Sequence, residues 1–290
     1  MEQFLAFFQP NLLVVNSLIN FVVMRILRAL FDFYINSSIH VAVAMLSLVC
    51  ITSQILSMPI DFMLTGFAFF VTLVGYNFVK YESWLRNDKP MDRSLKAIFM
   101  ISLVSFFAAL FCFLHLPFLV QIYVIVFVAL LLLYAIPFFP NKRNIRNWSG
   151  VKIYLVAFCW TGISFLLPLA NIGITLSSVV LINIVQRFIM ILALILIFEI
   201  IDLKKDAISL GTVPQRIGVK RTKIVGILLL VLFCFLEFLK VDFSQASFLI
   251  TVKWSAVVAL FTLFAHPNRS KYYTSFWVES LPLIGLLLRL

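Results

Sequence analysis

Charged residues are scarce in this sequence. Asp, Glu, Lys and Arg together make up 12% of its 290 residues, about half of the share in soluble globular proteins. Glycine and proline number only nine and ten, which excludes a collagen-like or low-complexity chain. Hydrophobic residues instead account for 63% of the chain, and the mean hydropathy is +1.10. These values exclude an ordinary soluble enzyme and indicate an all-α, polytopic membrane protein.

Cysteine pairs and a secretory signal are also missing. The four cysteines lie singly in apolar runs and form no C-x-x-C motif, so we expect small core residues, neither disulfides nor metal ligands. The N-terminal stretch lacks the basic region and small-residue cleavage site of a signal peptide.

Apolar runs of about 20 residues, the length that crosses a bilayer core, predict nine transmembrane helices. Their expected ranges are 38–57, 61–80, 96–115, 117–138, 152–170, 177–199, 223–240, 246–265 and 274–290. Together they form one domain, 38–290, and leave residues 1–37 as a separate N-terminal segment. In that segment Asn16, Asn20, Arg28 and Asp32 recur at multiples of four. This stripe predicts an interfacial helix; a tenth span is the alternative.

The distribution of basic residues predicts the orientation. With the N-terminus inside, 19 of the 23 Lys and Arg residues fall in inner segments. Lys240 and Arg289 fall outside, and Arg187 and Lys253 within spans. This asymmetry predicts a multi-pass protein of the cell membrane, placed in a bacterial inner membrane, with a cytoplasmic N-terminus. The net charge of +11 then reflects orientation in the lipid bilayer, and no nucleic-acid partner is expected.

The densest cluster of acidic residues follows the sixth predicted span. If the helix continues through Asp206, then Glu199, Asp202 and Asp206 share one face at the cytoplasmic end. Such carboxylates can hold Mg²⁺, which keeps several waters and is completed by substrate phosphates. Lys204 and Lys205 are candidate phosphate neutralisers. The alternative is a solvated helix end with local ion pairs.

This stretch resembles the second aspartate-rich motif of the UbiA superfamily of intramembrane prenyltransferases. Asp202 and Asp206 match its D-x-x-x-D pattern, and Gly211, Thr212 and Pro214 resemble the turn that follows. Members of that family have nine transmembrane helices around a central cavity. Their two aspartate motifs follow helices two and six and face each other on the cytoplasmic side. The resemblance covers nearly the whole chain.

Two other segments compare differently with the family pattern. Tyr134, Lys142 and Arg143 resemble a family stretch that contributes to diphosphate binding; positive-inside anchoring is the alternative. The first aspartate motif, N-D-x-x-D-x-x-x-D, is degenerate here. Asn77 matches its Asn, but Phe, Tyr and Leu stand at the three Asp positions. Lys80 is the candidate replacement for the metal's charge.

The resemblance implies transfer of an isoprenyl chain from an isoprenyl diphosphate to a lipophilic, aromatic acceptor, with Mg²⁺. Asp202, Asp206 and Lys80 are the expected catalytic residues, and Glu199 joins the two aspartates as a metal ligand. The diphosphate ligands are expected to be Asn77, Tyr134, Lys142 and Arg143. A non-catalytic descendant that binds lipid or diphosphate is one alternative, suggested by the degenerate first motif. A transporter is another, but the matched broken helices typical of transporters are not found.

Four ionisable residues lie within the predicted transmembrane helices. Because charges in membranes usually pair, Arg187 with Glu279 and Lys253 with Glu237 are candidate buried ion pairs. A role in the cavity is the alternative.

Overall fold

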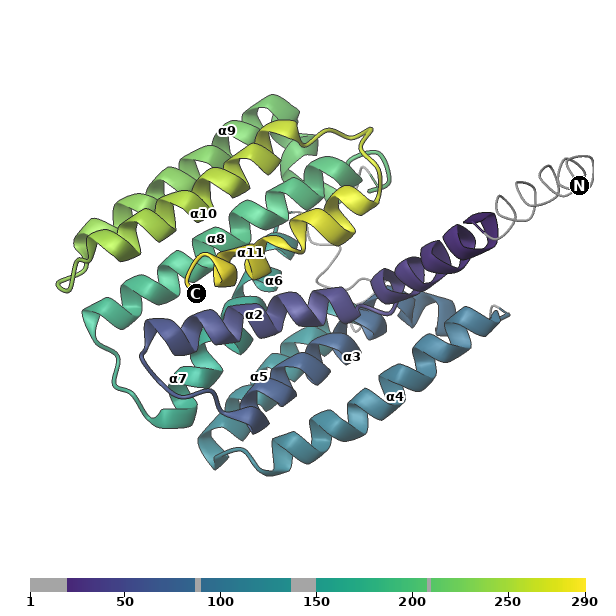
Figure 1. Ribbon diagram of the computed structural model, residues 1–290, viewed down its shortest axis with the longest axis horizontal. Helices are drawn as coiled ribbons and strands as arrows, with labels where there is room; N and C mark the ends of the chain where they lie inside the picture. Colours follow the sequence, from purple (N-terminus) through teal and green to yellow (C-terminus); the bar gives the residue numbers. More distant parts are fainter. Residues whose placement is uncertain (1–19, 87–89, 137–149, 208–209) are drawn as a thin grey trace, which may run out of the picture.

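The computed structural model describes residues 20–86, 90–136, 150–207 and 210–290, and those residues form helices and connecting turns without a strand. The helices pack side by side into a bundle (Figure 1). In chain order they are α2 (Ile39–Ile55), α3 (Phe62–Arg86), α4 (Arg93–Leu114), α5 (Phe118–Ala135), α6 (Lys152–Thr161), the π-helical turn η3 (Gly162–Leu166), α7 (Leu167–Ile172), α8 (Ser178–Asp202), α9 (Val213–Phe235), the 3₁₀ turn η5 (Leu236–Leu239), α10 (Gln245–Phe264), the π-helical turn η6 (Tyr273–Val278) and α11 (Leu281–Leu287).

A multi-pass, all-helical membrane fold is confirmed. Within the described ranges, seven helical stretches are long and apolar enough to cross a bilayer. The helix Asn20–Asn36 and α2 pass the same test together, although they are bent by 57° at their junction. At the last predicted span lie η6 and α11, which have only six and seven residues. The predicted count of nine spans therefore stays a prediction.

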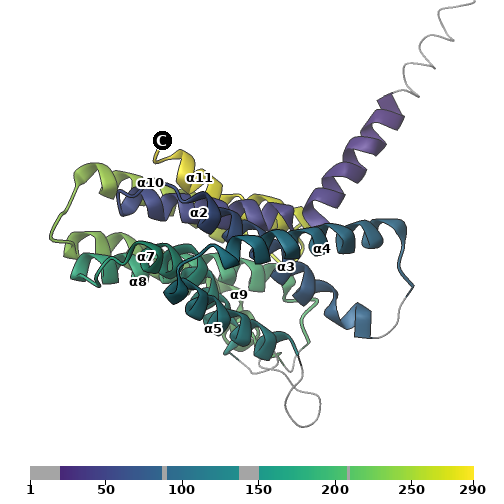
Figure 2. The same ribbon diagram turned by 90° about the horizontal axis from the view of Figure 1, so that it is seen from below.

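The N-terminal helix Asn20–Asn36 projects away from the bundle (Figures 1 and 2). The bend that frees it lies at Ser38, whose φ of 60° is left-handed. Large apolar side chains on this helix, among them Phe21 and Met24, are exposed. A helix with this surface suits the interfacial segment predicted from the sequence, and whether it lies on the membrane or crosses it stays a prediction. Asn16 lies outside the described residues.

The centre of the bundle is α8. Two thirds of its apolar window (67%) is buried inside the protein, compared with 22% for α4. Met190, Ala193 and Ile197 of α8 belong to one buried cluster with residues of α2, α9, α10 and α11. A helix that is apolar all round is expected at such a central position. Because α8 is fixed on all sides, the acidic residues at its end are held in a defined place.

Close helix packing depends on two glycines. A Cβ atom at Gly162 would lie 2.1 Å from the ring of Phe127, and one at Gly285 would lie 2.5 Å from the ring of Trp254. Small residues allow this approach of helices in membranes, where packing drives association. Of these residues, Phe127 lines the central cavity.

Candidate functional site

A cavity of about 320 Å³ lies inside the bundle between α2, α3, α5, α6, α8 and the C-terminal segment. Its wall is mostly apolar, and the aromatic residues that line it are Phe67, Tyr76, Phe127, Tyr134, Trp160 and Phe198. The indole N–H of Trp160 donates a hydrogen bond to the hydroxyl of Tyr76 at 3.0 Å. Cavities with apolar walls and a few polar groups are typical ligand sites.

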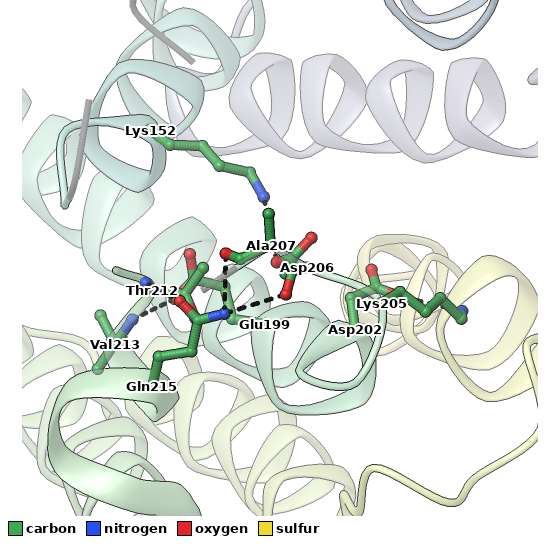
Figure 3. Close-up of polar contacts among 9 residues, drawn as sticks. All are labelled: Lys152, Glu199, Asp202, Lys205, Asp206, Ala207, Thr212, Val213 and Gln215. Carbon is green, nitrogen blue, oxygen red and sulfur yellow. Dashed lines mark hydrogen bonds and ion pairs between the residues drawn. The ribbon is translucent and has the colours of Figure 1, made fainter. Parts of the chain in front are cut away.

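Three carboxylates line one end of this cavity: Glu199, Asp202 and Asp206. Glu199 is buried, and its Oε2 accepts a hydrogen bond from the backbone N–H of Val213 at 3.0 Å (Figure 3). Asp202 forms an exposed ion pair of 3.1 Å with Lys205. Such surface pairs contribute little to stability, so Asp202 can exchange this partner for a ligand.

Asp206 faces a different cation, Lys152, at the start of α6. The Nζ of Lys152 lies 3.9 Å from Oδ2 of Asp206, and both side chains line the cavity (Figure 3). That distance is too long for a hydrogen bond. The Asp206 oxygen is buried and has no hydrogen bond to any residue that the structure describes. It is therefore an acceptor that faces a cation but receives no hydrogen bond, at the end of an apolar cavity.

The backbone of the acidic segment differs from the expectation. The helix α8 ends at Asp202, and the carbonyl of Asp202 accepts hydrogen bonds from the N–H groups of Lys205 (2.8 Å) and Asp206 (2.9 Å). The expectation of a helix through Asp206 is thus wrong, because a turn takes over four residues earlier. The chain must reverse here to enter α9, and Gly211, with a φ of 51°, lies in the reversal.

Gln215 of α9 fixes the loop that carries Asp206. Its amide nitrogen donates to the carbonyls of Asp206 (3.3 Å) and Ala207 (3.2 Å), and its oxygen accepts from the N–H of Thr212 (2.9 Å) (Figure 3). These three bonds join the loop to the first turn of α9. No motif in the sequence marks Gln215 as a site residue; its position three residues after Thr212, as in a helix-capping pair, is the signal that the sequence offers.

The donor set fits Mg²⁺ only in part. In the part of the chain that the structure describes, no three His, Cys, Asp or Glu residues are grouped so that they could hold a metal ion. Glu199 is committed to the Val213 amide, and the structure does not bring it into a common cluster with Asp202 and Asp206. Two carboxylates at one cavity mouth still suit Mg²⁺, which is commonly held by one or two carboxylates, water and substrate phosphates.

Neither Asn77 nor Lys80 is part of the cavity lining. The Asn77 amide donates to the carbonyl of Ser37 (3.0 Å) and to the hydroxyl of Ser102 (2.8 Å). Lys80 donates to the carbonyl of Asn36 (3.0 Å). The last carbonyls of a helix need hydrogen-bond donors from outside that helix. The carbonyls that accept here lie at the end of the N-terminal helix, at its bend. Residues that align with the first aspartate motif thus hold the bend.

The remaining predicted site residues have varied positions. Tyr134 is buried and lines the cavity. Lys142 and Arg143 lie outside the described residues. Lys204 contacts the side chain of Asn268 and does not line the cavity. In the sequence Lys152 is one of the positive-inside residues and no motif marks it, because its place at the mouth depends on how α6 packs against α8.

The two expected buried ion pairs do not form. Arg187 donates to the carbonyl of Leu48 (2.8 Å) and the hydroxyl of Thr52 (3.1 Å), and Glu237 pairs with Lys240 (2.8 Å). Glu279, the expected partner of Arg187, instead lines the cavity. A backbone carbonyl and a hydroxyl of the neighbouring helix α2 each accept one hydrogen bond from Arg187, which charge pairing in the sequence could not show. Lys253 is exposed.

Comparison with known proteins relates this bundle to two solved structures. A UbiA homolog from Aeropyrum pernix K1 matches with a TM-score of 0.62 and 11% sequence identity, covering 87% of this chain and 98% of that one. A digeranylgeranylglyceryl phosphate synthase matches with a TM-score of 0.53 and 16% identity, covering 89% of this chain and 96% of that one. No family model and no curated protein sequence matches. The chain has the fold of the UbiA proteins, and the resemblance drawn from its aspartate motif is confirmed at the level of the fold.

Proposed function

We propose that this protein is a UbiA-like prenyltransferase that moves an isoprenyl chain from an isoprenyl diphosphate to a lipophilic, aromatic acceptor within the membrane. The observation that carries the proposal is the placement of Asp202 and Asp206 at the mouth of an apolar, aromatic-lined cavity. The UbiA fold supports the same reading. A polar mouth beside an apolar cavity suits a donor with a diphosphate head and an isoprenoid chain.

The diphosphate would lie at the acidic mouth. Asp202 and Asp206 would hold Mg²⁺ there, and the bound ion would neutralise charge that develops on the departing diphosphate. Lys152, which lines the cavity beside Asp206, would move from that carboxylate to a phosphate oxygen. Tyr134 lines the same cavity and, with Lys142 and Arg143, remains a candidate for diphosphate binding on the strength of the family resemblance.

The isoprenoid chain would occupy the apolar part of the cavity. When its C–O bond breaks, the electron pair leaves with the diphosphate and positive charge develops at the allylic carbon. The rings of Tyr76, Tyr134 and Trp160 line this space, and aromatic faces stabilise cations. The acceptor carbon then forms the new bond and releases a proton. The walls exclude water, which would otherwise capture the same cation.

A non-catalytic binding protein is the second candidate, and one observation favours it. In place of the first aspartate motif, Asn77 and Lys80 are bonded to backbone carbonyls at the N-terminal bend. Only one aspartate motif is thus available for metal and diphosphate. The two functions share the same donor site and differ in whether the C–O bond breaks.

The proposal also includes an orientation. The Asp202–Asp206 mouth and Lys152 belong to the end of the bundle where the positive-inside pattern places the basic links. We therefore place the mouth and the N-terminus on the cytoplasmic side, in line with the expected bacterial inner membrane. Accessibility of single cysteines, Lys204→Cys and Asp242→Cys, in sealed membranes tests this assignment. We expect position 204 to be labelled from the cytoplasmic side and position 242 from the opposite side; any other pattern would contradict it.

Donor binding is the first experiment. Geranylgeranyl diphosphate and farnesyl diphosphate are titrated onto the protein in nanodiscs, with Mg²⁺ and with EDTA. We expect binding that requires Mg²⁺ and is lost in the double variant Asp202→Asn, Asp206→Asn. Asp242→Asn is the matched control, because this exposed aspartate lies in the turn before α10, outside the cavity lining. Binding that is equal in EDTA, or unchanged in the double variant, would overturn the proposed site.

A further inference from the structure

A second, much smaller pocket lies along α8, away from the acidic mouth. Its volume is about 20 Å³, and it shares no lining residue with the large cavity. Polar side chains from α8, η5, α10 and the C-terminal end contribute to it: Asn183, Gln186, Arg187, Glu237, Lys240, Thr251 and Arg289. Such a cluster inside an apolar bundle requires a physical explanation, because polar groups in membranes are costly.

The charges in this pocket do not balance. Three cations line it, Arg187, Lys240 and Arg289, but Glu237 is its single acidic residue. Glu237 already accepts hydrogen bonds from Lys240 (2.8 Å) and Gln186 (2.9 Å). An arginine keeps its proton in proteins. The lining therefore carries at least one net positive charge, even if Lys240 is neutral.

Hydrogen-bond acceptors are also too few. Arg187 is buried and donates to two acceptors, the Leu48 carbonyl and the Thr52 hydroxyl, whereas a guanidinium carries five N–H donors. The Nε of Arg289 is buried and has no acceptor among the described residues. Buried donors without acceptors are rare in native proteins. The pocket thus has an excess of positive charge and of N–H donors.

We propose that this pocket binds a small monovalent anion of the size of chloride, held by Arg187 and Arg289. The pocket has room for about one water-sized species, which is too small for a lipid phosphate group. A halide is an acceptor only, so it satisfies the free N–H groups and offsets the excess charge at once. A water molecule would bring donors of its own and no charge.

The anion would join segments that are distant in the sequence. Arg187 belongs to α8 and is bonded to α2 through Leu48 and Thr52. Arg289 follows α11, and Lys240 follows η5. An ion between them would hold the C-terminal end against the centre of the bundle. Because it binds the folded state, its occupancy would raise the stability of the protein.

Thermal unfolding in nanodiscs tests the site. The unfolding midpoint is measured in sodium chloride, in sodium bromide and in sodium isethionate at equal ionic strength. We expect the midpoint to rise by several degrees with halide concentration and then to saturate, with no rise in the bulky isethionate. Arg289→Gln should abolish the halide response, whereas Lys253→Gln, an exposed cation of α10 outside the pocket, should retain it. Equal midpoints in all salts, or a full response in Arg289→Gln, would overturn the proposal.

A second measurement covers the case in which Arg289→Gln does not fold. Crystals grown in bromide should show an anomalous peak between Arg187 and Arg289, and an empty pocket in well-ordered crystals at saturating bromide would contradict the site. Neither measurement depends on prenyl transfer, so the anion site and the proposed function can fail separately.

Discussion

The side chain of Lys80 donates a hydrogen bond of 3.0 Å to the backbone carbonyl of Asn36. Tyr81 donates to the same carbonyl at 2.9 Å, and Asn77 donates to that of Ser37 at 3.0 Å. These donors of α3 occupy the region where UbiA-like sequences carry their first aspartate motif. In this chain that region stabilises the bend between the N-terminal helix and α2.

Replacing Asn77 or Lys80 should therefore lower the stability of the protein more than it lowers the affinity for the donor. Asn77→Ala leaves the buried Ser37 carbonyl without its donor and should cost about 1–3 kcal/mol of unfolding free energy. Lys80→Ala, at an exposed position, should cost less. Unfolding midpoints and geranylgeranyl diphosphate affinity are measured together in nanodiscs. Loss of donor affinity in Lys80→Ala with an unchanged midpoint would show instead that Lys80 binds the diphosphate.

Gln215→Ala should weaken Mg²⁺-dependent donor binding by about tenfold. The variant removes the bonds that join the carbonyls of Asp206 and Ala207 to α9, and the net value of one or two such bonds is about 1–1.5 kcal/mol. Titration of donor onto the variant measures the effect. Gln245→Ala, an exposed residue at the start of α10, is the matched control. An affinity equal to that of the parent protein would show that the loop needs no anchor.

Gly285→Ala should destabilise the bundle by about 1–3 kcal/mol, because overpacking forces neighbouring groups to shift. The added Cβ would lie 2.5 Å from the Trp254 ring, and that ring is buried with its indole N–H bonded to the Leu281 carbonyl at 2.9 Å. Thermal unfolding measures the change. Gly66→Ala is the comparison, since its Cβ would lie at an ordinary 3.4 Å from Cys112. Equal midpoints for the two variants would refute the close contact.

Stability at acid pH should depend on Asp61, which caps the start of α3. Partial burial acts to raise the pKa of Asp61, but hydrogen bonds from the Leu64 amide, the Asn171 side chain and the Met63 amide outweigh it, so the pKa lies below the usual 3.8. A lowered pKa means that the stabilisation is complete above about pH 4 and is lost as the pH falls through the folded-state value.

Asp61→Ala should accordingly remove about 1 kcal/mol at neutral pH, the typical value of an N-cap side chain. It should also flatten the dependence of the unfolding midpoint on pH below 4. Midpoints of the parent protein and the variant between pH 3 and pH 7 give the comparison. A constant difference between the two curves across that range would contradict the assignment.

The sequence predicts the helices of this fold well because each apolar run must cross the same thickness of bilayer. Helix positions agree with the predicted ranges from α2 to α10 within a few residues, apart from the longer start of α9. That start, at Val213, lies ten residues before the predicted span because a short polar stretch of helix precedes the apolar one, and the two are divided at Gly218, whose φ of 80° and ψ of 158° are not helical. Hydropathy measures the membrane-buried part of a helix and not its polar extension.

The site was predictable in part. Asp202 and Asp206 were found from their spacing, and both line the cavity. Glu279, for which a role in the cavity is the alternative to an ion pair, lines the same space, and so does Lys152, which no motif marks. The positions of both depend on how distant helices pack. Asn77 has the residue type of the family motif, yet its partners are a carbonyl and a hydroxyl on other elements. Spacing along a helix shows on which face a residue lies. Tertiary packing determines which other elements or cavity that face contacts.

Product formation tests the central claim most directly. The protein in nanodiscs is incubated with radiolabelled geranylgeranyl diphosphate, Mg²⁺ and a lipid extract of its native membrane as the source of acceptors. We predict release of diphosphate and transfer of the label to a new lipophilic product, both lost in the Asp202→Asn, Asp206→Asn variant. Donor that binds in the presence of Mg²⁺ but stays intact through prolonged incubation would contradict prenyl transfer and identify a binding protein.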